Sequence, residues 1–240
     1  VITCPSNTTV SCEADNTSTA TGVATATDNC DDSPAITQSE TSTYSSDVTS
    51  VLHYNYVITR TWKATDVAGN SSTCDQTITV HDVTAPVITC PSNTTVSCEA
   101  DNTSTATGVA TATDNCDDSP AITQSETSTY SSDVTSVLHY NYVITRTWKA
   151  TDVAGNSSTC DQTITVHDVT APVITCPSNT TVNCQSDHTS TATGVATATD
   201  NCDPTPVITQ SDVSTQTASG TGHYNYVITR TWKATDVAGN

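Results

Sequence analysis

The chain of 240 residues contains no phenylalanine and no methionine, and it is poor in positive charge. Lys and Arg together number 6 against 25 Asp and Glu, which gives a formal net charge of −19. Such a surface repels nucleic acid and anionic membranes and attracts cations, so we expect no nucleic-acid partner. No stretch approaches the roughly 18 consecutive apolar residues of a membrane-spanning helix, so we also expect no membrane insertion.

The sequence repeats itself with a period of 86 residues: "VITCPSNTTV" begins at Val1, Val87 and Val173. This period is longer than the roughly 20–50 residues of a solenoid unit and is sufficient for a small domain with its own core. We therefore predict three tandem domains, 1–86, 87–172 and 173–240, of which the third lacks its closing strand. Identical copies in series favour a structural or adhesive role, because length and multivalency increase with copy number. We expect no enzyme.

Strand signals dominate the chain. β-branched residues are frequent, and Pro, Gly, Asn and Asp interrupt them about every ten residues, which is the pattern of an all-β sandwich. The clearest strand lies within "HYNYVITRTWKATD", residues 53–66, and "DVAGN" after it predicts a hairpin turn with a positive φ at Gly69. Alternation of side chains along this strand predicts an inward face that comprises Tyr54, Tyr56, Ile58, Arg60, Trp62 and Ala64. A guanidinium buried on that face requires an acidic or carbonyl partner, so we expect one for Arg60.

The 11 cysteines include no CxxC pair and no grouping with histidine, so they indicate disulfides and an oxidising compartment rather than zinc. Four cysteines in a full repeat allow three pairings. We favour Cys4–Cys74 and Cys12–Cys30, because the first ties the opening strand to the closing one. Cys176 is left over, because its partner lies beyond Asn240, because it bonds another chain, or because a neighbouring subunit supplies the final strand. The same pattern in the other repeats pairs Cys90–Cys160, Cys98–Cys116 and Cys184–Cys202.

Four short motifs in a fixed order resemble the hyalin-repeat (HYR) family and its bacterial relatives. They are "CP" near the start, "ATDNC", "ATDVAGN" followed by "TC", and a closing "TVHDVTAP". The resemblance covers each full repeat. It implies immunoglobulin-like or fibronectin-III-like β-sandwich modules in tandem, in secreted or surface proteins that act in adhesion or extracellular assembly. It implies no chemistry.

Aspartates crowd two loops that an immunoglobulin-like sandwich places at the same end, where the linker from the preceding domain also arrives. The arrangement is similar to cadherins, in which an Asp-rich linker shares calcium with the next domain. Because calcium takes six to eight oxygen ligands, we predict a Ca²⁺ site at each junction. The alternative is that these side chains only cap turns and solvate loops. Replacement of Asp118 by Pro204 would weaken the second site. The candidate ligands are Asp82, Asp114, Asp117, Asp118 and Asp152 at the first junction, and Asp168, Asp200, Asp203 and Asp236 at the second.

Together these features predict a rod of disulfide-bonded β-sandwich domains in an extracellular fibre or adhesin stalk. The expected partners are neighbouring copies of the same protein, and glycans or surface proteins are further candidates. Two other functions remain open. One is a cell-surface adhesin that recognises a glycan or protein through its loops, and the other is an accessory module of a larger secreted enzyme.

Overall fold

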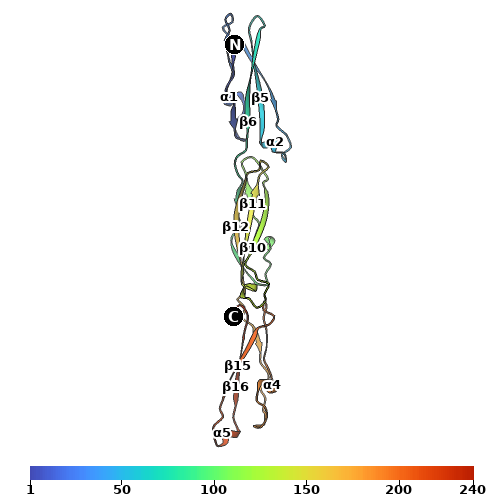
Figure 1. The fold of residues 1–240 in the computed structure, drawn as a ribbon, viewed down its shortest axis with the longest axis vertical. Helices are drawn as coiled ribbons and strands as arrows, with labels where there is room; N and C mark the ends of the chain where they lie inside the picture. The colour runs from blue at the N-terminus through green and yellow to red at the C-terminus, as the bar shows by residue number, and fades with distance from the viewer. The chain divides into compact units, whose positions relative to one another are not determined.

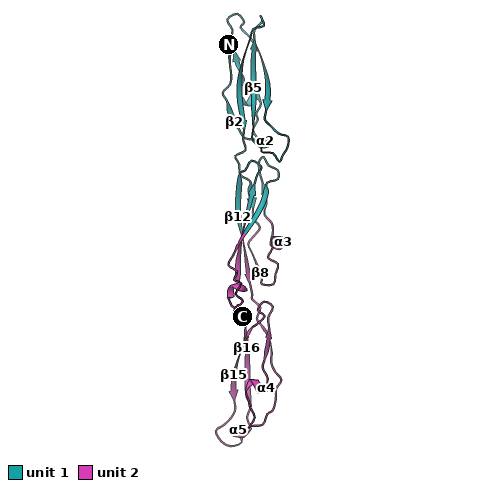
Figure 2. Cartoon of the chain, turned by 45° about the vertical axis from the view of Figure 1, so that its right-hand side comes forward, with its two compact units in different colours: residues 1–90, 110–125, 147–161 teal, residues 91–109, 126–146, 162–240 magenta.

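The computed structural model describes residues 1–240 and is all-β, with several separate sheets. The chain forms two compact units, coloured separately in Figure 2. The boundary between them passes through the second repeat, so the three domains expected from the sequence stay a prediction. Unit 1 comprises Val1–Cys90, Ala110–Ser125 and Thr147–Asp161, and unit 2 comprises Pro91–Val109, Glu126–Arg146 and Gln162–Asn240.

The first repeat lies wholly in unit 1 and contains a four-stranded sheet in the order β2-β6-β5-β4, with a separate two-stranded sheet β1-β3. The two longest strands, β5 and β6, run side by side in Figure 1 and are antiparallel, whereas β2 pairs with β6 in parallel. The elements are β1 (Ile2–Thr3), β2 (Thr8–Val10), α1 (Ser18–Thr21), β3 (Thr25–Ala26), β4 (Ala35–Ser42), α2 (Val51–Tyr54), β5 (Tyr56–Thr65) and β6 (Ser71–Val80).

The inward face expected for residues 53–66 is confirmed along β5. Ile58, Trp62 and Ala64 are buried, and Ile58 packs with Ile78 and Val80 of β6. The alternation arises because successive side chains of a strand point to opposite faces of its sheet. Because neither Phe nor Met is available, this core cluster consists of β-branched side chains, with Val10, Cys12 and Tyr56 packed against it.

Arg60 is the one cation on this inward face and is only 1% exposed. Its Nε donates to Glu40 Oε1 at 2.6 Å, its Nη1 to Thr21 Oγ1 at 2.7 Å, and its Nη2 to the Asn16 carbonyl at 2.8 Å. Nη1 also donates to Gln76 Oε1 at 3.4 Å. The acidic and carbonyl partners that burial of a guanidinium requires are therefore present.

The hairpin between β5 and β6 forms at the expected residues, with Gly69 at φ +92°. The expected strand "TGVATAT" forms only in part. α1 (Ser18–Thr21) comes first, and only Thr25–Ala26 joins a sheet. Gly22 at φ +106° separates the two, and a Cβ at this position would lie 2.9 Å from Pro5 Cβ. A turn in the left-handed region, which suits glycine, thus replaces the first half of that strand.

The second repeat has the same element order, and its four-stranded sheet β10-β11-β12-β8 contributes residues to both units. Its elements are β7 (Val87–Thr89), β8 (Thr94–Ser97), α3 (Ser104–Thr107), β9 (Thr111–Thr113), β10 (Ala121–Ser128), η1 (Val137–His139), β11 (Tyr142–Thr151) and β12 (Ser157–His167).

The third repeat, in unit 2, forms only two-stranded sheets, β13-β14 and β15-β16. No helix anywhere in the chain has the length and apolar character needed to cross a membrane. The elements of this repeat are β13 (Val173–Thr175), α4 (Ser190–Thr193), β14 (Thr197–Thr199), β15 (Val207–Ser214), α5 (Thr221–Tyr224) and β16 (Ile228–Thr235).

Candidate metal centre at the acidic loops

The cysteine nearest the acidic cluster of unit 1 belongs to a disulfide that joins two repeats. Cys12 is bonded to Cys116, with their Cα atoms 6.2 Å apart, and Cys30 is free and exposed. The expected pairing of Cys12 with Cys30 is therefore wrong, whereas Cys4 bonds Cys74 as expected. In unit 2, Cys98 bonds Cys202 in place of the expected Cys98–Cys116 and Cys184–Cys202 pairs. Cys90–Cys160, in unit 1, forms as expected, and Cys176 and Cys184 of unit 2 are free.

The length of β6 is the physical reason for this correction. Cys12 follows β2, which is paired with the end of β6 at Val80. The loop that holds Cys30 lies near the other end, because Asp31 Oδ2 accepts a hydrogen bond from the backbone N–H of Val67. Ten strand residues span about 30 Å, far more than a disulfide can bridge. A cysteine at the Val80 end can only bond a partner that comes to that end, and Cys116 of the following repeat does so.

Three carboxylates meet beside this disulfide. Oxygen atoms of Asp82, Asp114 and Asp152 all lie within 4.8 Å of one another. They come from three segments of unit 1: the linker after β6, the loop after β9 and the end of β11. The structure thus brings together three of the five ligands predicted at the first junction.

Asp82 and Asp114 are each held by backbone donors that leave one oxygen atom free, whereas Asp152 accepts from the backbone N–H and the side-chain amide of Asn156 on its two oxygens. Asp82 Oδ1 accepts from the N–H of Thr84 at 3.1 Å, and Asp114 Oδ1 accepts from the N–H groups of Cys116 and Asp117. The Oδ2 atoms of Asp82 and Asp114 are buried and have no hydrogen-bond partner. Buried acceptors without partners are rare in native proteins, because each costs about 1–3 kcal/mol or more when charged.

Burial and mutual repulsion both act on Asp82, which is 3% exposed. Its pKa is raised chiefly by burial, and the neighbouring charges of Asp114 and Asp152 raise it further. No Lys or Arg forms an ion pair with these three carboxylates, since every ion pair in the chain joins Arg60, Arg146 or Arg230 to a single acid elsewhere. The cluster therefore concentrates negative charge that a divalent cation would neutralise.

The same cluster recurs in unit 2 with Asp168, Asp200 and Asp236, whose oxygens also lie within 4.8 Å of one another. Asp168 is 2% exposed, and its pKa is raised by burial first and then by Asp200 and Asp236. The Oδ2 atoms of Asp168 and Asp200 are again buried without partners. The motifs that carry the three aspartates, "HDVTAP", "ATDNC" and "ATDVAGN", are identical at the two clusters.

Asp117, Asp118 and Asp203 do not join the clusters, so their prediction as ligands is corrected. Asp117 uses both carboxylate oxygens to bind the backbone N–H groups of Ser119 and Val153, and Asp203 binds Thr205 and Val237 in the same way. These two side chains fasten the acidic loop to the hairpin turn, which is the capping role held open above. Asp118 is exposed. Its replacement by Pro204 therefore removes no member of the second cluster.

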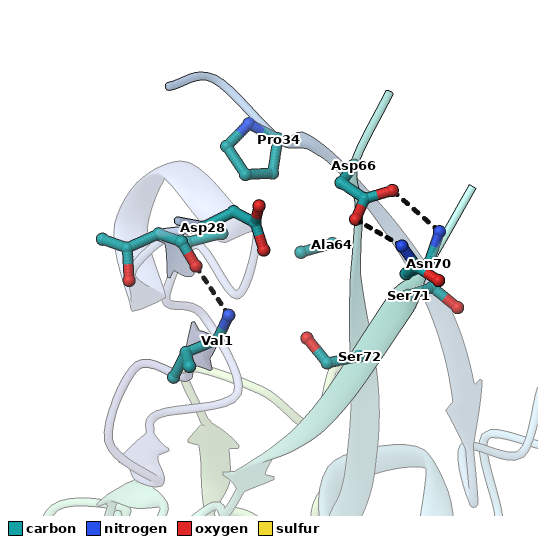
Figure 3. A pocket seen from close by; sticks show the side chains of 10 residues that line it. Val1, Asp28, Pro34, Ala64, Asp66, Asn70, Ser71 and Ser72 are labelled. Carbon is teal, nitrogen blue, oxygen red and sulfur yellow. Dashed lines mark hydrogen bonds between the residues drawn. The ribbon is translucent and has the colours of Figure 1, made fainter. Parts of the chain in front are cut away.

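The first repeat contains the same two loops, and its residues form no three-carboxylate cluster. Figure 3 shows the corresponding pocket, about 190 Å³ in volume, with Val1, Asp28 and Asp66 among the residues that line it. The backbone nitrogen of Val1 donates to the Thr27 carbonyl at 2.6 Å. Asp66 accepts two hydrogen bonds from Asn70, which lower its pKa. Each cluster in the later repeats includes one linker aspartate, Asp82 or Asp168.

Sequence reasoning missed Asn115, whose Oδ1 is also buried without a partner. Amide oxygens are accepted calcium ligands, and an Asn between two acidic loop residues is the signal that could have identified it. Its Nδ2 faces the sulfur atoms of Cys12 and Cys116. These sulfur atoms also lie within 4.8 Å of an Asp82 oxygen, but bonded sulfurs are not thiolates and offer little to a metal.

Carboxylate and amide oxygens without nitrogen or thiolate ligands fit a hard cation such as Ca²⁺. Asp82, Asp114 and Asp152 would supply part of the six to eight oxygens that calcium takes, with Asn115 as a further candidate. The chemistry of the donor set thus agrees with calcium at each cluster and argues against zinc.

Comparison with known proteins returned no matching family model and no matching curated protein. The solved structures found are tandem cadherin extracellular domains. Drosophila N-cadherin EC1-4 is 14% identical over 68% of this chain, with a TM-score of 0.29, and the chain spans about half of that structure (48%). Protocadherin gamma B7 domains 1–4 are 13% identical over 96% of this chain and 66% of theirs, with a TM-score of 0.30.

The presence of four disulfides fits an extracellular adhesion or structural module, because disulfides persist in oxidising compartments. The resemblance to hyalin repeats is carried by the four sequence motifs alone.

Proposed function

We propose that this chain is a load-bearing segment of an extracellular fibre or adhesin stalk, in which Ca²⁺ binds at Asp82–Asp114–Asp152 and at Asp168–Asp200–Asp236. The proposal assigns the chain no catalytic role. The observation that carries it is the pair of buried, unpartnered oxygens in each cluster, Asp82 Oδ2 with Asp114 Oδ2 and Asp168 Oδ2 with Asp200 Oδ2. The order of the hyalin-like motifs and the presence of disulfides support an extracellular location for this segment.

Overlap of the disulfides supports a mechanical role. Cys12–Cys116 and Cys98–Cys202 each link residues 104 positions apart, and the two intervals overlap between residues 98 and 116. A pull on the two ends of the chain therefore follows a covalent path that bypasses most of the polypeptide. Such a chain resists extension even where a repeat unfolds, which is the property required of a stalk.

Calcium would act on the same segments that the disulfides join. Asp82 belongs to the linker of the first repeat, whereas Asp114 and Asp152 belong to loops of the second. The linker is also held by Asn156 Nδ2, which donates to the Asp82 carbonyl at 3.2 Å, and by Ser158 Oγ, which donates to the Pro86 carbonyl. A cation that neutralises the three carboxylates would remove the repulsion that opposes this contact.

The experiment is a calcium titration of the full oxidised chain by calorimetry. We expect two bound Ca²⁺ per chain, with dissociation constants of about 10⁻⁴–10⁻³ M, as in extracellular modules. Asp82→Asn should leave one bound Ca²⁺, and the matched control Asp118→Asn, which changes an exposed acid of the loop that carries Asp114, should leave two. Absence of binding, or equal loss in the two variants, would refute calcium at these clusters.

A further inference from the structure

The strand β4 forms one edge of the sheet in the first repeat, and β10 has the same place in the second. Both sheets contain their closing strands, β6 and β12. β4 pairs with β5 without interruption from Ala35–Thr65 to Ser42–Ile58, so no β-bulge disrupts the edge. Every residue of β4 except Ile36 is exposed, and β10 and β15 show the same pattern. An exposed, regular edge is a template on which another strand can pair.

Alternate residues of β4 turn their backbone groups outward. The N–H group of Thr43 donates to the Val57 carbonyl at 3.0 Å, and the equivalent bond forms in the other two repeats. In an antiparallel pair, residues that bond the neighbouring strand alternate with residues whose N–H and C=O groups face away from it. Counting back from Thr43, the residues of β4 that face away from β5 are Ile36, Gln38, Glu40 and Ser42.

The edge strands lack the features that usually prevent strand pairing. β4, "AITQSETS", contains no Lys, Pro or Gly, and its one acid, Glu40, is neutralised by Arg60. The other two ion pairs of the chain are Arg146–Glu126 and Arg230–Asp212, on β10 and β15. Every ion pair in a chain of net charge −19 thus neutralises the single acid of an edge strand. The edges are therefore the part of this acidic surface where a second copy meets least repulsion.

We propose that these edges bind the same edges of a second copy of this chain in antiparallel pairs. Identical strands pair about a two-fold axis, which makes the contact self-complementary. An axis at Ser39 brings the outward-facing residues together and places Gln38 opposite Glu40 of the second copy, so that the two acids do not face each other. Arg60 binds only Oε1 of Glu40, which leaves Oε2 to accept from the Gln38 amide. Backbone hydrogen bonds supply the affinity, as in other cases of strand addition.

This inference deepens the fibre role proposed above and rests on it for its biological setting, because it names the surface through which copies join. None of the clustered carboxylates takes part in the strand pairing. The calcium titration and the experiments below can therefore fail independently of each other.

The first test follows the full oxidised chain in a calcium chelator as the protein concentration rises. Sedimentation measures the mass, and hydrogen exchange with single-residue fragmentation reads β4 and β10 together, because their sequences are identical. The amides that face β5 should be protected at every concentration. The outward-facing amides should exchange rapidly in the monomer and roughly tenfold more slowly or less when copies associate. A chain that stays monomeric, or associates while these amides still exchange rapidly, would overturn the proposal.

A second test uses charge. Glu in place of the glutamine of each edge keeps every backbone donor and sets two acids opposite each other in the proposed register. Association should weaken roughly tenfold or more, because like charges directly opposite on paired strands are destabilising. These substitutions are Gln38→Glu, Gln124→Glu and Gln210→Glu. The matched control adds three acids to the exposed loops after the edge strands and should change association little. Its substitutions are Ser46→Glu, Ser132→Glu and Ala218→Glu. Equal weakening by the two sets would overturn the proposal, since net charge alone would then control association.

A third test removes the outward donor. Proline at the same three glutamines deletes only an N–H group that faces away from the sheet, a position where edge strands tolerate proline. It should abolish association and leave the thermal unfolding of the monomer nearly unchanged. Association that survives the three prolines would overturn the proposal. If proline unfolds the repeats, the paired sets of acidic variants decide the question.

Discussion

Cys12 is bonded to Cys116, so the loop after β2 of one repeat is covalently fixed to the acidic loop of the next. The aspartate cluster lies directly beside this bond, since a sulfur of the pair and an oxygen of Asp82 approach within 4.8 Å. The disulfide therefore ties the loop that carries Asp114 to the repeat that carries Asp82. The disulfide and the aspartate cluster are therefore neighbours, and mutations at each one separate their effects on stability.

Peptide mapping should recover Cys12 linked to Cys116 and find three free thiols, at Cys30, Cys176 and Cys184. Cys12→Ser and Cys116→Ser should each lower the free energy of unfolding by about 2–4 kcal/mol, because each releases the same long loop. Cys30→Ser is the control and should cost nothing measurable. A large loss in Cys30→Ser, matching that of Cys12→Ser, would restore the local pairing.

Asp82→Asn should have opposite effects with and without calcium. In chelator the variant should be more stable than the wild type, because a neutral amide removes the repulsion between buried carboxylates. In about 10 mM calcium the wild type should gain about 1.4–2.7 kcal/mol at this cluster, and the variant should not. Thermal unfolding in both buffers measures this. A variant less stable than the wild type in chelator would mean that Asp82 has a stabilising partner.

The raised pKa of Asp82 predicts a pH dependence in the absence of calcium. The folded state holds this proton more tightly than the unfolded state, so stability falls as pH rises from the ordinary aspartate value through the folded pKa. The deficit of the wild type relative to Asp82→Asn should therefore widen from about pH 4 to pH 7, as measured by urea unfolding.

Asp47 provides a control of opposite sign for this pH profile. Its pKa is lowered by the backbone N–H of Thr49, so its contribution is present at neutral pH and is lost as the pH falls. The difference between wild type and Asp47→Asn should shrink toward acid pH. Both differences shrink toward acid pH, but their signs are opposite: at neutral pH the wild type should be less stable than Asp82→Asn and more stable than Asp47→Asn. A wild type more stable than Asp82→Asn at neutral pH, with the surplus lost in acid, would fit only if the folded-state pKa of Asp82 were lowered.

Arg60→Ala should destabilise the first repeat by about 3–5 kcal/mol, because it leaves Glu40 and Gln76 without their buried partner. Lys63→Ala on the exposed face of the same strand should change stability by less than about 0.5 kcal/mol. Hydrogen exchange of β5 and β6 reports the loss locally. Arg146→Ala repeats the test in the second repeat, and a small effect at both positions would show that the guanidinium network is dispensable.

Pulling on the two ends of the chain should reveal the covalent bypass. With its disulfides intact the chain should extend to about 25 nm, and after reduction to about 80 nm, at about 3.5 Å per residue. Single-molecule force spectroscopy measures both lengths. Equal extensions before and after reduction would show that the disulfides do not carry the load.

Much of the fold followed from local pattern. Alternation along residues 53–66 predicted the inward face of β5, the lone arginine on that face predicted its acidic partner, and "DVAGN" predicted the hairpin. Repetition of "ATDNC" and "ATDVAGN" also indicated where acids gather. These signals are readable because side-chain direction in a strand and φ at a glycine depend on nearby residues alone.

The pairing of Cys12 and the membership of the acid cluster were decided by tertiary structure. Pairing Cys4 with Cys74 left Cys30 as the expected partner of Cys12, but β6 separates Cys12 from Cys30 by about 30 Å, and Cys116 arrives from the next repeat instead. Asp114 and Asp117 stand three residues apart in one loop, yet the first faces Asp82 and the second binds the hairpin turn. The sequence by itself determined the repeat, the strands and the acidic loops. Which side chains come into contact depended on the lengths and pairing of the strands, because these set which loops lie close together. Local sequence patterns do not encode those distances.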